Sequence, residues 1–432
     1  MRTISKATAL LLIVLMVSSC TQQKRKLDLP NIMLTTDFLI PHPVEVTATN
    51  TSFPLDQFTA ITTSDDEALE DVGLFLAEKI KTITKLDLQV NPSETRGVET
   101  VINIQLTDDF ETDNLEAYRL NIGEEEITLQ AASVAGAFRG IQTIRQLIPE
   151  QSNDDLADYN IWTIPSGIIS DVPQFKYRSA MLDVSRHFFS VEDVKKYIDI
   201  LSYYKINNLH LHLTDDQGWR IEIKSWPKLT EIGGATEVGG GEGGFYTQEE
   251  YTDIVNFAAR RHINIVPEID MPGHTNAASL SYPILDGSGK ELKPYEGIEV
   301  GFSTFDCRKD TVYAFIDDVI RELAALTPGP YIHIGGDESH VTTKSDFNYF
   351  INKVSKIVEK YGKQMIGWDE IVHADIDENS IVQYWYKKEN AHKGVEKGMK
   401  VILSPAEKAY LDMKYDEESD YGLEWAGYIP VD

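Results

Sequence analysis

Two adjacent carboxylates at the end of a short apolar run are the residues best placed to do chemistry. The stretch 331–339 reads YIHIGGDES, so Asp337 and Glu338 follow two glycines. Neighbouring side chains of a regular strand point to opposite faces, so these acids can share a site only where the strand becomes irregular. Gly335 and Gly336 supply that freedom. Two acids at a strand end are typical of barrel enzymes, although acids also favour a helix N-terminus.

Further polar and aromatic side chains follow the other predicted strands. They are Arg186, Asp215, Asp270, His274, Trp368, Trp385, Tyr410 and Asp412. Charged groups of this kind hydrogen-bond sugar hydroxyls, and aromatic rings stack on the C–H faces of sugars. A phosphate site would instead favour glycine-rich amides and lysine. The set therefore predicts a carbohydrate site, with packing inside the fold as the alternative for the two tryptophans.

Two histidines raise the question of a metal. His210 and His212 stand at i and i+2 on a predicted strand and therefore share one face. Some metal hydrolases present their ligands in this way, but we favour inward-facing, hydrogen-bonded histidines and expect no metal or organic cofactor. Cys307 is expected to be a buried small side chain rather than a nucleophile, and the sequence supports no disulfide framework because the chain has two cysteines.

Strand and helix patterns alternate from residue 174 to residue 432. Such βα repetition favours parallel strands, and chemical groups at nearly every strand end favour a (β/α)8-type TIM barrel. Strands are predicted at 180–184, 208–213, 263–269, 331–334, 365–368, 381–385 and 401–403, and helices at 248–261, 311–326 and 346–361 with another starting at Ser190. Asp193 lies three residues after Ser190, as in a capping box.

Residues 35–165 predict a separate, small α/β sandwich domain that supports the barrel. Apolar spacing indicates helices at 65–85 and 133–147, a strand at 101–106 and a hairpin of strands 118–122 and 127–130. The stretch 165–173 is expected to be a linker.

The N-terminus predicts export. A positive start and an apolar run in residues 1–19 are typical of a signal peptide. Residues 17–20, VSSC, resemble a bacterial lipobox, so we expect lipid on Cys20, a tether over 20–34 and a periplasmic or outer-membrane-associated lipoprotein; the alternative is a plain secretory signal. The net charge of -29 argues against a nucleic-acid partner.

Six ordered motifs together carry a resemblance to a known family. They are MLDVSRHFFS (181–190), NLHLHLTDDQGWRIEI (208–223), VPEIDMPGH (266–274), HIGGDE (333–338), GWDE (367–370) and YLD (410–412). The chain from about 175 to 425 resembles the family 20 glycoside hydrolases, the β-N-acetylhexosaminidases. The preceding domain is similar to the α/β domain that usually stands before that barrel.

The resemblance implies a substrate-assisted, retaining reaction, in which the 2-acetamido oxygen of the sugar attacks C1 and forms an oxazolinium ion. It implies that Glu338 is the general acid and then the base, and that Asp337 orients the acetamide. Tyr410 would hydrogen-bond the acetamide oxygen, and Trp368 and Trp385 would enclose the acetamide methyl group. Arg186 would hold ring hydroxyls, and Asp412 would contact the sugar or the leaving group. The residues that would tune Glu338 are Asp215, Asp270 and His274.

The sequence departs from the family pattern at the end of the chain. Only 29 of the 432 residues follow Leu403, whereas one βα unit takes about 30 residues. We therefore expect the eighth unit, with the tryptophan and glutamate that the family places there, to be missing. The expected function is exo-hydrolysis of terminal β-linked GlcNAc or GalNAc from glycans. A catalytically impaired glycan-binding barrel and a metal-dependent hydrolase are the alternatives.

Overall fold

A computed structural model describes residues 25, 27–94, 96–110, 112–149 and 160–430. The chain divides into two compact units, Met1–Pro173 and Gln174–Asp432. The predicted signal peptide and Cys20 lie outside the described residues. Part of the expected tether is not free: Arg25 pairs with Asp56 and Glu99, and Leu34 is buried.

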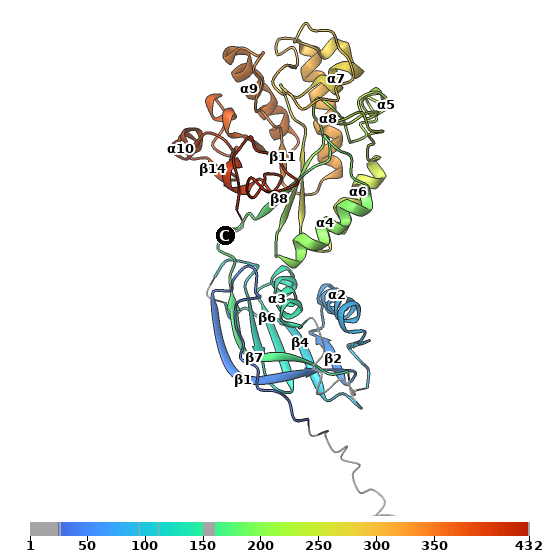
Figure 1. Cartoon of the computed structure of the whole chain (residues 1–432), viewed down its shortest axis with the longest axis vertical. Helices are drawn as coiled ribbons and strands as arrows, with labels where there is room; N and C mark the ends of the chain where they lie inside the picture. The colour runs from blue at the N-terminus through green and yellow to red at the C-terminus, as the bar shows by residue number, and fades with distance from the viewer. Residues whose placement is uncertain (1–24, 26, 95, 111, 150–159, 431–432) are drawn as a thin grey trace, which may run out of the picture. The chain divides into compact units, whose positions relative to one another are not determined.

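The first unit is a seven-stranded sheet with two packed helices (Figure 1). Its strand order is β1-β7-β5-β6-β4-β2-β3, with β5 and β6 forming the expected antiparallel hairpin. Side chains of both helices and of the strands share one apolar core. The elements are β1 (Glu45–Leu55), β2 (Thr59–Thr63), α2 (Glu67–Thr84), β3 (Gln89–Val90), β4 (Thr100–Leu106), β5 (Tyr118–Ile122), β6 (Glu126–Ala131), α3 (Val134–Leu147) and β7 (Trp162–Asp171).

The linker prediction for 165–173 is wrong. Most of this stretch belongs to β7, which pairs with β1 on one side and β5 on the other. Pro165 lies within the strand, at a position where β1 is irregular between Ala48 and Ser52. A proline is tolerated in a strand near such an irregularity, so Pro165 does not end the strand.

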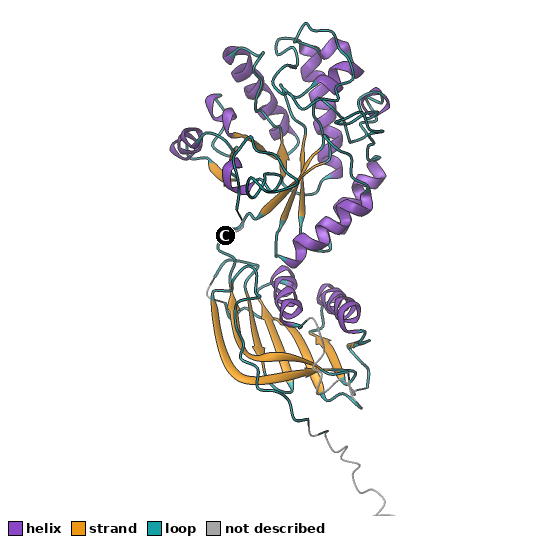
Figure 2. Cartoon of the chain, viewed as in Figure 1, coloured by secondary structure: helices purple, strands orange, loops and turns teal. Residues whose placement is uncertain are grey.

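The second unit contains seven parallel strands in chain order, as the alternating pattern predicts (Figure 2). They are β8 (Ser179–Asp183), β9 (Asn208–His212), β10 (Asn264–Glu268), β11 (Tyr331–His333), β12 (Gln364–Trp368), β13 (Ile381–Tyr384) and β14 (Lys400–Leu403). All seven predicted strands are confirmed within two residues at each end. Among the described residues, β8 and β14 are the two edges of this curled barrel sheet.

Helices follow the strands, and the longer ones pack in one apolar core with the sheet. They are α4 (Val191–Tyr203), α5 (Lys228–Glu231), α6 (Gln248–Ala259), α7 (Asn276–Ser281), α8 (Asp310–Leu326), α9 (Lys344–Lys360), α10 (Lys388–Glu396) and α11 (Ala406–Ala409). Ser190 caps α4, but its hydroxyl donates to the Asp193 carboxylate, so the expected capping box is incomplete. A complete box forms at Thr247 and Glu250 of α6.

Because side chains alternate along β9, its apolar residues and its histidines lie on opposite faces of the strand. Leu209 and Leu211 of β9 pack in the apolar cluster that the helices share, whereas His210 and His212 face the opposite side. Cys307 is buried, as expected, and burial raises the pKa of its thiol to about 12. Within the described residues, no helix has both the length and the apolar composition needed to cross a bilayer.

Candidate active site

The acid pair lies where β11 gives way to a glycine turn. Gly335, Gly336 and Glu338 have φ values of 68°, 98° and 43°, which are left-handed conformations. A Cβ on Gly335 would lie 1.7 Å from Asp270 Oδ1, so only glycine fits there. The turn brings both acids to one histidine: His274 Nε2 lies 3.7 Å from Asp337 Oδ2 and 3.6 Å from Glu338 Oε2. The two adjacent carboxylates therefore face the same group.

A buried chain of acids and imidazoles stands behind His274. Its Nδ1 lies 3.1 Å from Asp215 Oδ1, and the other Asp215 oxygen lies 2.8 Å from His212 Nε2. His212 Nδ1 continues the chain to Glu268 Oε2 at 2.6 Å. In contrast, His274 Nε2 and Asp337 Oδ1 are buried without a hydrogen-bond partner. A ligand can reach Asp337 only through the exposed part of its side chain, which is 15% of the side-chain surface.

Arg186 joins the same network from the turn after β8. Its guanidinium contacts Asp183 Oδ2 at 2.8 Å and Asp215 Oδ2 at 2.7 Å. The side chain keeps 30% exposure, so donors remain accessible beside these carboxylates. Although burial acts in the opposite direction, the charge of Arg186 and then that of His274 hold the pKa of Asp215 well below its usual range.

The environment favours a protonated Glu338. Burial first, and then the adjacent Asp337 charge, raise the pKa of Glu338, with His274 acting against both. Burial and the Asp337 charge likewise raise the pKa of Asp270 well above its ordinary value, so Asp270 is available as a neutral donor. A carboxyl whose protonated form is favoured by its surroundings has the properties of a general acid.

Aromatic side chains from the next strands gather in one cluster. Trp368 and Trp385 are buried with ring centroids 6.3 Å apart, and Tyr410 packs against them. Burial, followed by the Asp337 charge, raises the pKa of Tyr410, so its phenol is a neutral group close to that carboxylate. The structure thus places an aromatic cluster and a phenolic hydroxyl near the acid pair.

The family follows from comparison with known sequences. The model of the "Glycosyl hydrolase family 20, catalytic domain" matches residues 175–348 and 339–432, and that of "Glycosyl hydrolase family 20, domain 2" matches residues 36–172. The chain belongs to glycosyl hydrolase family 20. The resemblance predicted from six motifs is therefore confirmed, as is the barrel with a preceding α/β domain.

Individual relatives of this family 20 chain carry hexosaminidase names. A Cellulomonas fimi protein, "Beta-N-acetylhexosaminidase", is 38% identical over 397 residues, covering 91% of this chain and 78% of its own length. A Porphyromonas gingivalis "Beta-hexosaminidase" is 36% identical, covering 97% of this chain and 56% of its own. A mutant Streptomyces plicatus beta-hexosaminidase structure in complex with product (GlcNAc) is 44% identical with a TM-score of 0.86, covering 93% of this chain and 81% of its own.

Two residues that contact the aromatic cluster, Trp425 and Glu370, were given no role from the sequence. The ring centroid of Trp425 lies 6.1 Å from that of Trp385 and 5.6 Å from that of Tyr410. Glu370 accepts a hydrogen bond from the Trp385 indole, and burial followed by the Asp337 charge raises its pKa to about 8. Asp412, which was predicted from the sequence, is exposed and lies on the loop beside Tyr410, shortly after the single turn α11.

The contacts of His210 and His212 bear on whether these two histidines are metal ligands. His210 Nε2 and His212 Nδ1 both approach Glu268 Oε2, at 2.8 and 2.6 Å. They are buried and inward-facing, as we expected. Donors already surround that carboxylate, and the geometry is that of a hydrogen-bonded network.

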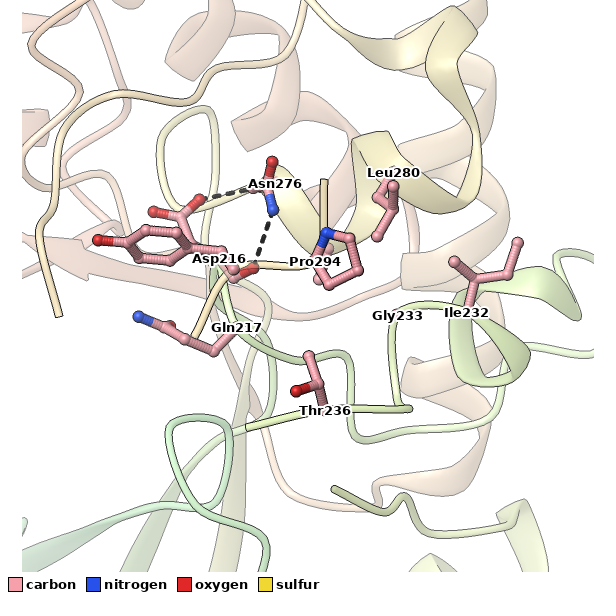
Figure 3. Close-up of a pocket in the computed structure, with 10 residues that line it drawn as sticks. Asp216, Gln217, Ile232, Gly233, Thr236, Asn276, Leu280 and Pro294 are labelled. Carbon is pink, nitrogen blue, oxygen red and sulfur yellow. Dashed lines mark hydrogen bonds between the residues drawn. The ribbon is translucent and has the colours of Figure 1, made fainter. Parts of the chain in front are cut away.

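A small cavity beside Asp216 is separate from the acid pair (Figure 3). Asp216 accepts the backbone N–H of Asn276, and the Asn276 amide donates to the Asp216 carbonyl. The cavity measures about 10 Å³, which is room for roughly one water molecule and not for a sugar. These contacts tie the Asp215–Asp216 turn to the segment that carries His274.

Asp369 fixes the position of Trp385. Its buried carboxylate accepts the backbone N–H groups of Trp385, Tyr386 and Lys387 through one oxygen and the Asn390 amide through the other. We expect Asp369→Ala to lower the free energy of unfolding by about 2–4 kcal/mol, since each orphaned buried donor costs about 1–3 kcal/mol. Two of the four donors count less, because Tyr386 and Lys387 are exposed residues. Chemical denaturation of the whole chain measures the change.

Asp369→Asn is the matched control, because it keeps the shape and one acceptor oxygen. We expect it to lose less than the alanine variant. Equal losses in the two variants would show that the carboxylate charge, which both variants lack, stabilises this turn, and not the side-chain volume or the acceptor oxygen that asparagine keeps.

Proposed function

We propose that this chain is an exo-acting β-N-acetylhexosaminidase that releases terminal, non-reducing β-linked GlcNAc or GalNAc by a retaining, substrate-assisted reaction. The observation that carries the proposal is the convergence of Asp337 and Glu338 on His274 Nε2, with the aromatic cluster beside them. The GlcNAc named with the Streptomyces plicatus structure supports the choice of sugar.

The roles follow from charge and position. Glu338, whose raised pKa favours its protonated form, donates to the leaving oxygen and then takes a proton from water. The Asp337 carboxylate, whose side chain keeps 15% exposure, accepts the acetamide N–H and stabilises the positive charge that develops on the oxazolinium ring. Tyr410 donates to the acetamide oxygen while it attacks, and Trp368 and Trp385 enclose the methyl group.

Arg186 and Asp412 act on other parts of the sugar. Arg186 is partly exposed and carries more donors than its two carboxylate contacts use, so it binds ring hydroxyls away from the scissile bond. That contact favours a chain end. Asp215, Asp270 and His274 hold and tune Glu338, and the exposed Asp412 contacts the sugar or the leaving side.

An assay with matched aryl glycosides tests the proposal. Purified protein should hydrolyse aryl β-GlcNAc or aryl β-GalNAc but not the aryl β-glucoside, which lacks the attacking acetamide. Early product should be the β-anomer by NMR, and a chitooligosaccharide labelled at its reducing end should lose only single terminal sugars. Equal turnover of the glucoside, or the α-anomer first, would contradict the mechanism.

Two further outcomes separate the alternatives. Binding of the sugar without turnover by folded protein would indicate a glycan-binding barrel. Activity that is lost with a chelator and restored by a divalent cation would indicate the metal-dependent hydrolase.

We also propose that the protein is exported and held in the cell envelope by lipid on Cys20. The apolar leader and the VSSC motif support this placement. Mass spectrometry of the N-terminal peptide should find acylated Cys20, and Cys20→Ser should move the protein from the membrane fraction to the soluble fraction. Unacylated Cys20 with the leader removed would indicate a plain secretory signal.

A further inference from the structure

One buried carboxylate, Glu268 at the end of β10, connects two parts of the site. It is fully buried. Its Oε1 accepts the indole N–H of Trp368 at 2.9 Å, and its Oε2 receives His210 and His212. Strand register brings these groups together, because Glu268 lies opposite His212 on β9 and opposite His333 on β11.

The Oε1 contact depends on Trp368. His333 Nδ1 also lies 3.1 Å from Oε1, but it accepts the backbone N–H of Gly335 at 3.0 Å. Because the Nδ1 lone pair accepts this N–H, Nδ1 does not donate to Glu268 at the same time. Trp368 is therefore the donor that Glu268 Oε1 holds, and the hydrogen bond sets the tilt of the indole within the aromatic cluster.

The Oε2 contact leads to the acid pair. His212 bridges Glu268 and Asp215, with one ring nitrogen on each carboxylate. A bridge between two carboxylates suits an imidazolium; although burial opposes it, the Glu268 charge, followed by that of Asp183, raises the pKa of His212 well above its ordinary value. Asp215 then holds His274 and Arg186. The orientation of His274 toward Glu338 thus depends on a chain that starts at Glu268.

We propose that Glu268 is a positioning residue that aligns two groups at once, the Trp368 wall of the acetamide pocket and the His212–Asp215–His274 chain that orients Glu338. The inference rests on the proposed function and deepens it. Glu268 itself is buried behind both groups and does not touch the sugar. Its two oxygens link the fit of the N-acyl group to the delivery of the proton.

The proposal requires that both carboxylate oxygens of Glu268 act as hydrogen-bond acceptors. Both oxygens of Glu268 face N–H donors. Glu268→Gln replaces one oxygen with an NH₂ group, which then points at a donor, so either Trp368 or the His210–His212 pair loses its acceptor. Displacements on the order of 1 Å at the reacting groups cost about 10²-fold in rate.

The experiment compares wild type with Glu268→Gln in the full chain, using aryl β-GlcNAc and its N-propionyl analogue as well as two aryl leaving groups of different basicity. Active sites are titrated, so that misfolded protein does not lower the apparent kcat. We expect a loss of about 10²-fold in kcat/KM, a smaller preference for N-acetyl over N-propionyl, and a steeper dependence on leaving-group basicity. A fall in active fraction with unchanged selectivities would overturn the proposal.

Trp368→Phe separates the two branches, because it removes the indole N–H and keeps an aromatic ring. It should change the N-acyl preference and leave the leaving-group dependence as in wild type; a change in both would contradict the two-branch assignment. Glu268→Asp, which keeps the charge on a shorter side chain, should recover part of the loss. If Glu268→Gln does not fold, these two variants decide the question.

Glu322→Gln is the matched control. Glu322 lies in α8, where its carboxylate likewise accepts several hydrogen bonds, from Lys224, Ser225 and Gln248. We expect unchanged selectivities in this variant. An inactive wild-type protein would contradict the proposed function, whereas an active wild type with an equally active Glu268→Gln variant would contradict only the inference about Glu268.

Discussion

Glu338→Gln should lower kcat by about 10²–10⁴-fold, the usual contribution of a positioned general acid–base group. The amide keeps the size of the side chain but has no proton to deliver. The loss should be largest for a basic leaving group such as a sugar, and smaller for an activated aryl group that leaves without protonation. Steady-state rates on the two substrates measure the difference.

The pH dependence of kcat/KM is an independent test of the role of Glu338. Glu338 must be protonated to act as an acid, and burial followed by the Asp337 charge raises its pKa. Wild-type kcat/KM should therefore fall as pH rises through that raised pKa, and the Gln variant should lack this alkaline limb. Glu359→Gln, an exposed carboxylate paired with Lys356, is the control and should behave as wild type. Equal rates for Glu338→Gln and wild type would remove Glu338 from the mechanism.

Asp337→Asn should lower kcat by about 10²–10³-fold, which is typical for the loss of one preorganised electrostatic contact. The variant keeps the side-chain shape, but it loses the negative charge beside the acetamide nitrogen. Rates on aryl β-GlcNAc measure this loss, with the exposed Asp253→Asn, paired with Lys195, as the control.

The same variant should also move the pH profile. The Asp337 charge raises the pKa of Glu338, so neutralising Asp337 lowers that pKa and the alkaline limb should shift to lower pH. A limb that stays in place, or moves to higher pH, would show that the two carboxylates do not interact as the structure indicates.

The barrel was readable from the sequence because its signals are local. Alternating βα patterns, apolar spacing and glycine turns depend on short stretches of chain, and all seven strands appear within two residues of their predicted ends. The N-terminal sheet was only partly readable. Its strands β1 and β7 pair across more than 100 residues, and β7 carries a proline that we interpreted as a linker signal.

We could name the acids, the arginine and the tryptophans of the site from the sequence, because these residue types are the ones that bind sugars and transfer protons. Their connections were decided by the tertiary structure. Glu268 and Trp368 are 100 residues apart, yet they share a hydrogen bond, and Trp425 reaches the aromatic cluster only through the fold of its loop. Which residues are present is local information, whereas which donor meets which acceptor depends on strand register and packing between distant segments.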